Sequence, residues 1–182
     1  QIILRSSSII KESTSLSSDI EKAVTVIVNS LKKGNKVILF GNGGSAADAQ
    51  HIAAEFIGRF QKERKSYPAI SLTSDSSVLT SLSNDYSFDL IFSRQCESLV
   101  NADDVVIAIS TSGNSQNIVK GLEMSREKGA KTISLLGNSG GIIKNYSDIA
   151  IIVNSNVTAH IQEVHRVIYH IVCNFVEKSL SE

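Results

Sequence analysis

The sequence predicts a doubly wound α/β fold, a three-layer sandwich around a central parallel sheet of about five strands. Short apolar runs that are typical of buried strands alternate with stretches of helical periodicity. The runs are apolar throughout, as expected for strands that helices cover on both faces. A chain of 182 residues with 42% apolar composition is long enough for one domain with a substantial core.

The first part of the chain contains two rounds of this alternation. A helix is expected at 18–33, where Ser18 and Glu21 form a capping pattern and Gly34 provides a stop. The elements that follow are a strand at 36–40, a helix at 45–60, a strand at 69–72 and helical stretches at 76–82 and 88–99.

The second part continues in the same way. Strands are expected at 104–110, 131–136 and 149–153, and helices at 115–128, 140–146 and 158–179, the second of these being a short turn. Apolar side chains cover well over half of the circumference of the last helix. Such a helix must be buried on several sides, and we expect other subunits to cover some of them.

Composition and charge restrict the class of protein. Eighteen basic residues balance eighteen acidic ones, so no net charge draws the chain to nucleic acid or to an anionic membrane. Cys96 and Cys173 have no partner at metal-ligand or redox spacing and are expected to be buried thiols. The sequence shows neither an apolar run of membrane-spanning length nor a signal-peptide pattern. These features predict a cytoplasmic protein without nucleic-acid or membrane partners.

Two loops rich in glycine and hydroxyl groups each join a strand to a helix. The first, GNGGSAAD at 41–48, has glycines where the backbone must turn sharply and a ligand can come close. The second, STSGNS at 110–115, gathers hydroxyls at a helix N-terminus, where hydroxyls and free amides bind phosphate without a lysine. Either loop alone could be an ordinary turn. The pair favours a phosphate ligand at the carboxyl edge of the sheet.

Candidate reacting groups lie on two of the expected helices. His51 and Glu55 are four residues apart on the helix after the first loop, so they share a face and can meet at one metal ion or substrate. An isolated pair of this kind is more often a surface feature, but the adjacent glycine loop favours a functional role. Gln162, His165 and His170 interrupt the apolar pattern of the last helix. We interpret His165 as a hydrogen-bonded core or interface residue, because an unsatisfied buried polar group is costly.

Several segments, in matching order and spacing, resemble the phosphoheptose isomerases of the sugar isomerase (SIS) family. They are GNGGSAADAQHIAAEF at 41–56, the pair Asn84 and Asp85, ISTSGNS at 109–115, and IQEVH at 161–165 with His170. The resemblance extends from about residue 32 to the end of the sequence. It implies one flavodoxin-like SIS domain over 1–182, in which a helical segment at 1–33 serves oligomer packing and 34–182 forms the α/β core.

The resemblance also implies an activity and a set of site residues. The activity is an aldose-ketose isomerisation of D-sedoheptulose 7-phosphate to D-glycero-D-manno-heptose 7-phosphate through an enediolate, the first step of ADP-heptose synthesis for the lipopolysaccharide core. Glu55 and His170 are the implied acid/base pair, and the implied metal is one zinc ion per subunit, bound by His51, Glu55, Gln162 and His170. The implied substrate contacts are Asn42, Gly43, Gly44, Glu55, Asn84, Asp85, Ser110, Thr111, Ser112, Ser115 and Gln162.

The spacing within the last helix bears on the oligomeric state. Gln162 and His170 are eight residues apart, which separates their backbones by about 12 Å along a helix. Either both side chains lean toward one ion, or different subunits supply them. Because the last helix is also too apolar for its own domain to cover, we expect a homotetramer with active sites completed across interfaces.

Two alternative functions fit the same fold. A non-catalytic relative that binds the bacterial replication initiator protein would need no carboxylate at Glu55. A phosphosugar-sensing SIS domain would keep both loops without an acid/base pair, and the sequence shows no accompanying DNA-binding segment. His51, Glu55 and His170 together favour the isomerase. The sequence departs from the family at His160, where many relatives have an arginine, and at Ala159, where some have an acid. This affects local substrate contacts and leaves the reacting groups unchanged.

Overall fold

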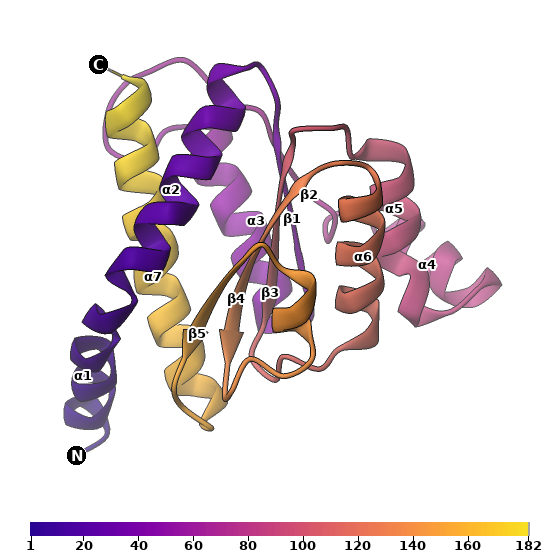
Figure 1. Ribbon diagram of the computed structural model, residues 1–182. Coiled ribbons are helices and arrows are strands. Elements are labelled where there is room, and N and C mark those ends of the chain that lie inside the picture. Colours follow the sequence, from indigo (N-terminus) through magenta and orange to yellow (C-terminus); the bar gives the residue numbers. More distant parts are fainter. Residues whose placement is uncertain (182) are drawn as a thin grey trace.

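The computed structural model describes residues 1–181, which form three layers with helices on both faces of a parallel sheet (Figure 1). The strand order within this part of the chain is β2-β1-β3-β4-β5. The predicted doubly wound α/β sandwich is confirmed. The strands are β1 (Val37–Gly41), β2 (Ala69–Ser71), β3 (Val105–Ser110), β4 (Lys131–Gly137) and β5 (Ile149–Val153).

Two separate cores hold the layers together. Alternate strand residues point to opposite faces, so that Val37 and Leu39 of β1 belong to one core while Ile38 and Phe40 belong to the other. The first core is covered by α1 (Ile2–Glu12), α2 (Ser17–Lys32), α3 (Gly44–Ile57) and α7 (Thr158–Leu180). The second is covered by α4 (Ser76–Asp85), α5 (Ile91–Leu99) and α6 (Gln116–Glu127).

Three helix boundaries differ from the predictions. The chain enters α2 from α1 through a 3₁₀ turn (Ser13–Leu16), so Ser18 lies inside a helical run and the predicted capping role is wrong. The helix expected at 45–60 ends at Ile57, because the next residues turn toward α7. The helix expected at 88–99 begins with a 3₁₀ turn (Phe88–Leu90) before α5. The expected stop at Gly34 is confirmed by its φ of 85°.

The two thiols are buried, as predicted. Cys96 belongs to the core under α5, and Cys173 belongs to the core under α7. Burial raises the pKa of Cys96 to about 11 and that of Cys173 to about 12. Both side chains therefore act as small apolar groups at neutral pH.

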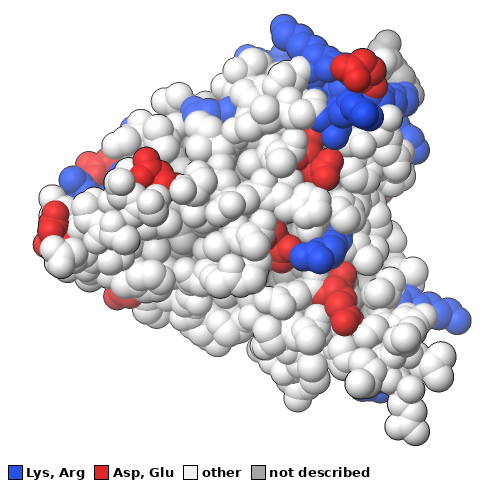
Figure 2. All heavy atoms as spheres, turned by 180° about the vertical axis from the view of Figure 1, so that it is seen from behind, with Lys and Arg blue, Asp and Glu red and all other residues white. Residues whose placement is uncertain are grey.

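The surface carries both signs of charge. Figure 2 shows acidic and basic side chains scattered over a mostly uncharged face, with the densest group of lysines and arginines at one corner. This distribution agrees with a net charge of +0. A search of the helices described in 1–181 finds none that combines the length and apolar character needed to cross a bilayer.

Candidate active site and metal centre

The strand order places a topological switch point between β1 and β3. After β1 the chain moves to one side, to β2, and the later strands β3, β4 and β5 extend to the other side. The loops after β1 and β3 therefore flank the point where the direction of the sheet reverses, which is where open α/β sheets bind ligands. Gly43 has φ 56° and Gly113 has φ 70°, values that favour glycine in both loops.

The second loop is held in shape by its own hydrogen bonds. Ser110 Oγ accepts from the amide of Gly113 at 3.1 Å, and Ser112 Oγ accepts from the amide of Asn114 at 3.2 Å. Ser115 occupies the N-cap position of α6, yet among the described residues its hydroxyl bonds to none of the helix amides. That hydroxyl and the first amides of α6 are therefore available to an anion.

Asn42 joins the two loops. Its side-chain amide forms a reciprocal pair with that of Asn117, with both N–O distances at 2.9 Å. Asn117 is buried in the first turn of α6 and was not singled out from the sequence. The sequence feature that could have drawn attention to Asn117 was its position just after the second loop, for which a function was expected. The pair fixes the first glycine loop against the start of the helix that follows the second loop.

Helices α3 and α7 lie side by side and run in the same direction, and we call their contact the α3–α7 seam. A Cβ on Gly44 would come within 2.6 Å of Nε2 of Gln162, so Gly44 and Gln162 are in contact at the start of the seam. Further along, Asp48 meets Arg166 at 3.2 Å, and His51 then meets His170 with ring centroids 5.3 Å apart. The α3 residues recur at the i, i+4, i+7 spacing of one helix face.

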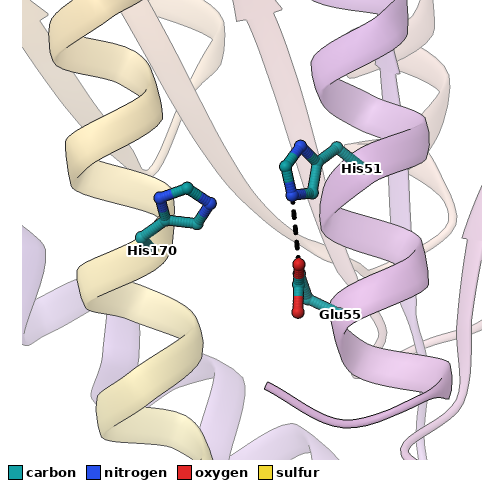
Figure 3. Close-up of side chains that lie close together, drawn as sticks. All are labelled: His51, Glu55 and His170. Carbon is teal, nitrogen blue, oxygen red and sulfur yellow. Dashed lines mark hydrogen bonds and ion pairs between the residues drawn. The ribbon is translucent and has the colours of Figure 1, made fainter. Parts of the chain in front are cut away.

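The seam brings His51, Glu55 and His170 together as a triad (Figure 3). One potential ligand atom from each lies within 4.8 Å of the other two. Nε2 of His51 is 3.0 Å from Oε1 of Glu55, while His170 approaches from the opposite helix. Burial lowers the pKa of His170, and the neighbouring His51 lowers it further. At neutral pH His170 is therefore a neutral imidazole that can bind a metal or accept a proton.

The triad fits a zinc ion by its donor set and spacing. Two imidazoles and a carboxylate form one of the ligand sets found at catalytic zinc, where a fourth position stays open. Nδ1 of His51 already has a partner, the hydroxyl of Tyr169 at 3.3 Å, which leaves Nε2 facing Glu55. The side chains of His51 and Glu55 are only partly covered, so solvent and substrate can reach them.

Other predicted site residues lie away from the triad within one chain. Gln162 rests against Gly44 at the start of the seam, eight residues before His170. Asn84 and Asp85 end α4, which packs on the other face of the sheet, and they hydrogen-bond to each other at 2.8 Å. The triad and the remaining predicted contacts are thus distributed over two regions of the chain.

The structure also places polar residues beside the triad that sequence reasoning missed. Arg166 donates from Nε to the hydroxyl of Tyr169 at 3.0 Å, and Tyr169 lies 3.3 Å from Oδ1 of Asp48. Burial raises the pKa of Tyr169, so its hydroxyl stays protonated. Asp48 could have been noticed because it precedes His51 by one helical turn on the same face.

His165 is a core residue, as interpreted from the sequence. Its side chain is 0% exposed, and Nε2 donates to the carbonyl of Leu136 at 3.1 Å. Burial lowers its pKa to about 4. The residue is therefore neutral in the folded protein at neutral pH and anchors α7 to β4.

Comparisons with known proteins find similarity over most of the chain. The SIS domain family model matches residues 4–137. A phosphoheptose isomerase of Citrifermentans bemidjiense is 55% identical over 165 residues, covering 91% of this chain and 86% of that protein. A structure of a phosphoheptose isomerase from Francisella tularensis has a TM-score of 0.91 at 34% identity and covers 97% of this chain and 95% of its own. The phosphoheptose isomerase GmhA from Neisseria gonorrhoeae has a TM-score of 0.83 at 35% identity, with coverage of 98% and 100%.

Proposed function

Because the chain belongs to the SIS domain family and, within it, to the phosphoheptose isomerases, we propose that it interconverts D-sedoheptulose 7-phosphate and D-glycero-D-manno-heptose 7-phosphate. The observation that carries the proposal is the triad of His51, Glu55 and His170. A relative that only binds the replication initiator, or a phosphosugar sensor, would have no need of an acid/base pair. In this proposal the product supplies ADP-heptose synthesis for the lipopolysaccharide core, in the cytoplasm.

Glu55 and His170 are the proposed acid/base pair. Isomerisation needs one group to carry a proton between C1 and C2, and another to carry a proton between the two oxygens. The carboxylate of Glu55 suits the carbon proton. The neutral imidazole of His170 can accept and return the hydroxyl proton when its free nitrogen lone pair is not bound to a metal. Both side chains face the same space from neighbouring helices, which supports a shared substrate (Figure 3).

The proposed cofactor is one zinc ion per subunit. His51, Glu55 and His170 would hold it, with Gln162 as a further ligand. When bound, zinc would stabilise the negative charge that develops on the enediolate oxygens. Glu55 has two carboxylate oxygens, so it can serve the metal with one and the substrate with the other.

The loops at the carboxyl edge of the sheet are the proposed phosphate site. Hydroxyls and amides at the start of α6 would hold the phosphate, and binding energy gained there would position the distant reacting carbons. The rigid hydrogen bonding of the second loop supports this role. The full set of proposed substrate contacts is Asn42, Gly43, Gly44, Glu55, Asn84, Asp85, Ser110, Thr111, Ser112, Ser115 and Gln162.

The proposed assembly is a homotetramer whose active sites are completed across interfaces. A groove of about 610 Å³ between α2 and α7 has an apolar lining that includes Val24, Ile171 and Phe175. Phe175 is 50% exposed although it belongs to a largely buried helix. A second copy that covers this groove would remove that apolar surface from water. The separation of Gln162 from the triad supports a site that draws on more than one chain.

An assay on the full chain tests the proposed function. Purified protein is incubated with sedoheptulose 7-phosphate and with shorter ketose phosphates, with and without a zinc chelator. We expect turnover of the seven-carbon substrate, its loss with chelator, and about one zinc ion per subunit by metal analysis. Glu55→Gln should abolish turnover, whereas Glu127→Gln, an exposed carboxylate on α6, should not. A folded, zinc-loaded protein without isomerase activity would contradict the proposal.

A further inference from the structure

The hydroxyl of Tyr169 lies at the centre of a hydrogen-bond network that combines two buried residues, Tyr169 and Asp48, with two partly exposed ones, His51 and Arg166. It is 3.3 Å from Nδ1 of His51, 3.3 Å from Oδ1 of Asp48 and 3.0 Å from Nε of Arg166. Tyr169 is 2% exposed and Asp48 is 3% exposed. The ring of Tyr169 also packs against both histidines of the triad, with centroids 5.4 Å from His51 and 4.7 Å from His170.

Donor and acceptor accounting allows two arrangements of this network. Arg166 is always a donor, so its Nε–H uses one lone pair of the tyrosine oxygen, and the hydroxyl has a single proton to give. In one arrangement Tyr169 donates to His51 Nδ1, and Nε2–H of His51 donates to Glu55. In the other, His51 Nδ1–H donates to Tyr169, and Tyr169 donates to Asp48.

A metal ion on Nε2 of His51 would select the second arrangement. A neutral imidazole that gives its Nε2 lone pair to a metal carries its proton on Nδ1, and this proton needs an acceptor. Tyr169 then accepts from His51 and Arg166 and donates to Asp48, so every polar group of the network is satisfied. Asp48 is held for this purpose by its ion pair with Arg166 at 3.2 Å.

We propose that Tyr169 is a positioning residue for the metal site: its hydroxyl accepts a hydrogen bond from Nδ1–H of His51 and donates one to Asp48, so that Nε2 of His51 faces the ion. This inference rests on the zinc site of the proposed function. The roles of Asp48 and Arg166 are to orient the hydroxyl, and neither contacts the ion. Glu55 and His170 complete the metal site independently of the network.

Zinc affinity of the intact protein tests the proposal. Tyr169→Phe removes the hydroxyl and keeps the ring that packs on both histidines, so folding should be preserved. Competition with a chromophoric zinc chelator should show affinity about 10- to 100-fold weaker than in the wild type. Tyr146→Phe, which removes a tyrosine hydroxyl on the other face of the sheet, should bind zinc like the wild type.

The outcomes separate this inference from the proposed function. If the wild type binds zinc and Tyr169→Phe binds it equally well, the positioning role is wrong and the metal site stands. If the wild type does not bind zinc, the positioning role and the metal site are both wrong, whereas the isomerase activity is decided separately by the turnover assay. A selective loss of zinc affinity in Tyr169→Phe supports the positioning role and the metal site.

Proton–nitrogen correlation spectra of the ring nitrogens provide a second readout that a purely structural role would not affect. In the zinc-loaded wild type we expect the His51 proton on Nδ1. His165, whose Nε2–H donates to Leu136, serves as the internal reference for the opposite tautomer. A zinc-loaded His51 protonated on Nε2 would overturn the proposal.

Discussion

Glu177 forms an ion pair with Arg64 in which Oε1 lies 3.0 Å from Nε and both side chains are almost fully buried. The same carboxylate accepts hydrogen bonds from the amides of Phe60, Gln61 and Lys62. Arg64 in turn donates to the carbonyl of Glu55, near the end of the helix that carries two of the three triad residues. The pair fastens the segment after α3 to the last turns of α7.

Glu177→Gln should therefore destabilise the fold strongly. The substitution leaves the guanidinium of Arg64 buried without its counter-charge, for which a loss of about 3–5 kcal/mol is expected. Urea denaturation monitored by circular dichroism measures this loss of unfolding free energy. Glu97→Gln, which breaks an exposed ion pair with Arg94, is the matched control and should cost under about 1 kcal/mol. Equal decreases in the free energy of unfolding of the two variants would show that the buried ion pair stabilises the fold no more than the exposed one.

The free energy of unfolding should decrease as the pH is lowered, because His165 binds a proton more readily in the unfolded chain than in the folded protein. Its pKa is about 4 when folded, below the ordinary value of 6.5, so the unfolded chain binds more protons between these values and stability decreases as pH falls. The loss attributable to this residue should approach about 3 kcal/mol at pH 4. Denaturation is measured in chelator at several pH values for the wild type and for His165→Gln. Because His170 is present in both proteins, the difference between their pH dependences gives the contribution of His165.

Ring signals of His165 provide an independent check of this prediction. In the folded wild type they should not shift between pH 7 and about 5. A residue that titrates near its ordinary pKa would contradict the assigned burial effect. An equal pH dependence of stability in His165→Gln would contradict it as well.

The second loop should be needed for substrate binding more than for stability. Ser112→Ala with Ser115→Ala removes two hydroxyls proposed to contact phosphate, and each lost bond to a charged group is worth about 1.5–3 kcal/mol. We expect KM to rise at least about tenfold, while loss of the bond from the Asn114 amide to Ser112 Oγ lowers the free energy of unfolding by only about 1 kcal/mol. Steady-state kinetics and urea denaturation measure the two quantities.

Asp75→Ala is the matched control for this loop. Asp75 caps α4, and its Oδ1 accepts from the amide of Val78 at 3.0 Å. Loss of that cap should cost about 1 kcal/mol of stability and leave KM unchanged. An unchanged KM in the serine double variant would contradict the proposal that this loop binds the substrate phosphate.

Local patterns in the sequence were sufficient to predict most of the fold. Apolar runs located the strands, and Gly34 marked a helix end through its own backbone preference. One failure involves a contact between distant residues, and the other involves a preceding helical segment that the capping pattern did not indicate. Helix α3 ends early because the amides after it bond to Glu177, and Ser18 is no cap because α1 precedes it in a continuous helical run.

The candidate site also contains some residues that the sequence could predict and others that it could not. His51 and Glu55 could be paired from their spacing on one helix, and His170 was added by resemblance to a family. The network around Tyr169 depends on the register between α3 and α7, which aligns Asp48 with Arg166. Spacing within either helix carries no information about that register. The position of Gln162 against Gly44 could not be predicted for the same reason.

Complementation between inactive variants should reveal whether the chains of the proposed tetramer share an active site. Glu55 and His170 of one chain lie in one triad, so Glu55→Gln and His170→Asn each destroy the triad of the chain that carries them. Mixed tetramers of these two variants have no intact triad, and we expect no recovery of activity after co-expression. The assay requires differently tagged chains, so that mixed assemblies can be purified and their formation confirmed.

A different pair of variants should recover activity. Glu55→Gln keeps an intact phosphate loop, and the double variant of Ser112 and Ser115 keeps an intact triad. If one chain supplies the loop and its neighbour the triad, random mixing restores about a quarter of the sites. Recovery with this pair but not with the first would support interface completion. Verified mixed tetramers that stay inactive with both pairs would show that each chain supplies its whole site, and Gln162 would then have to leave Gly44 and lean along α7 toward His170.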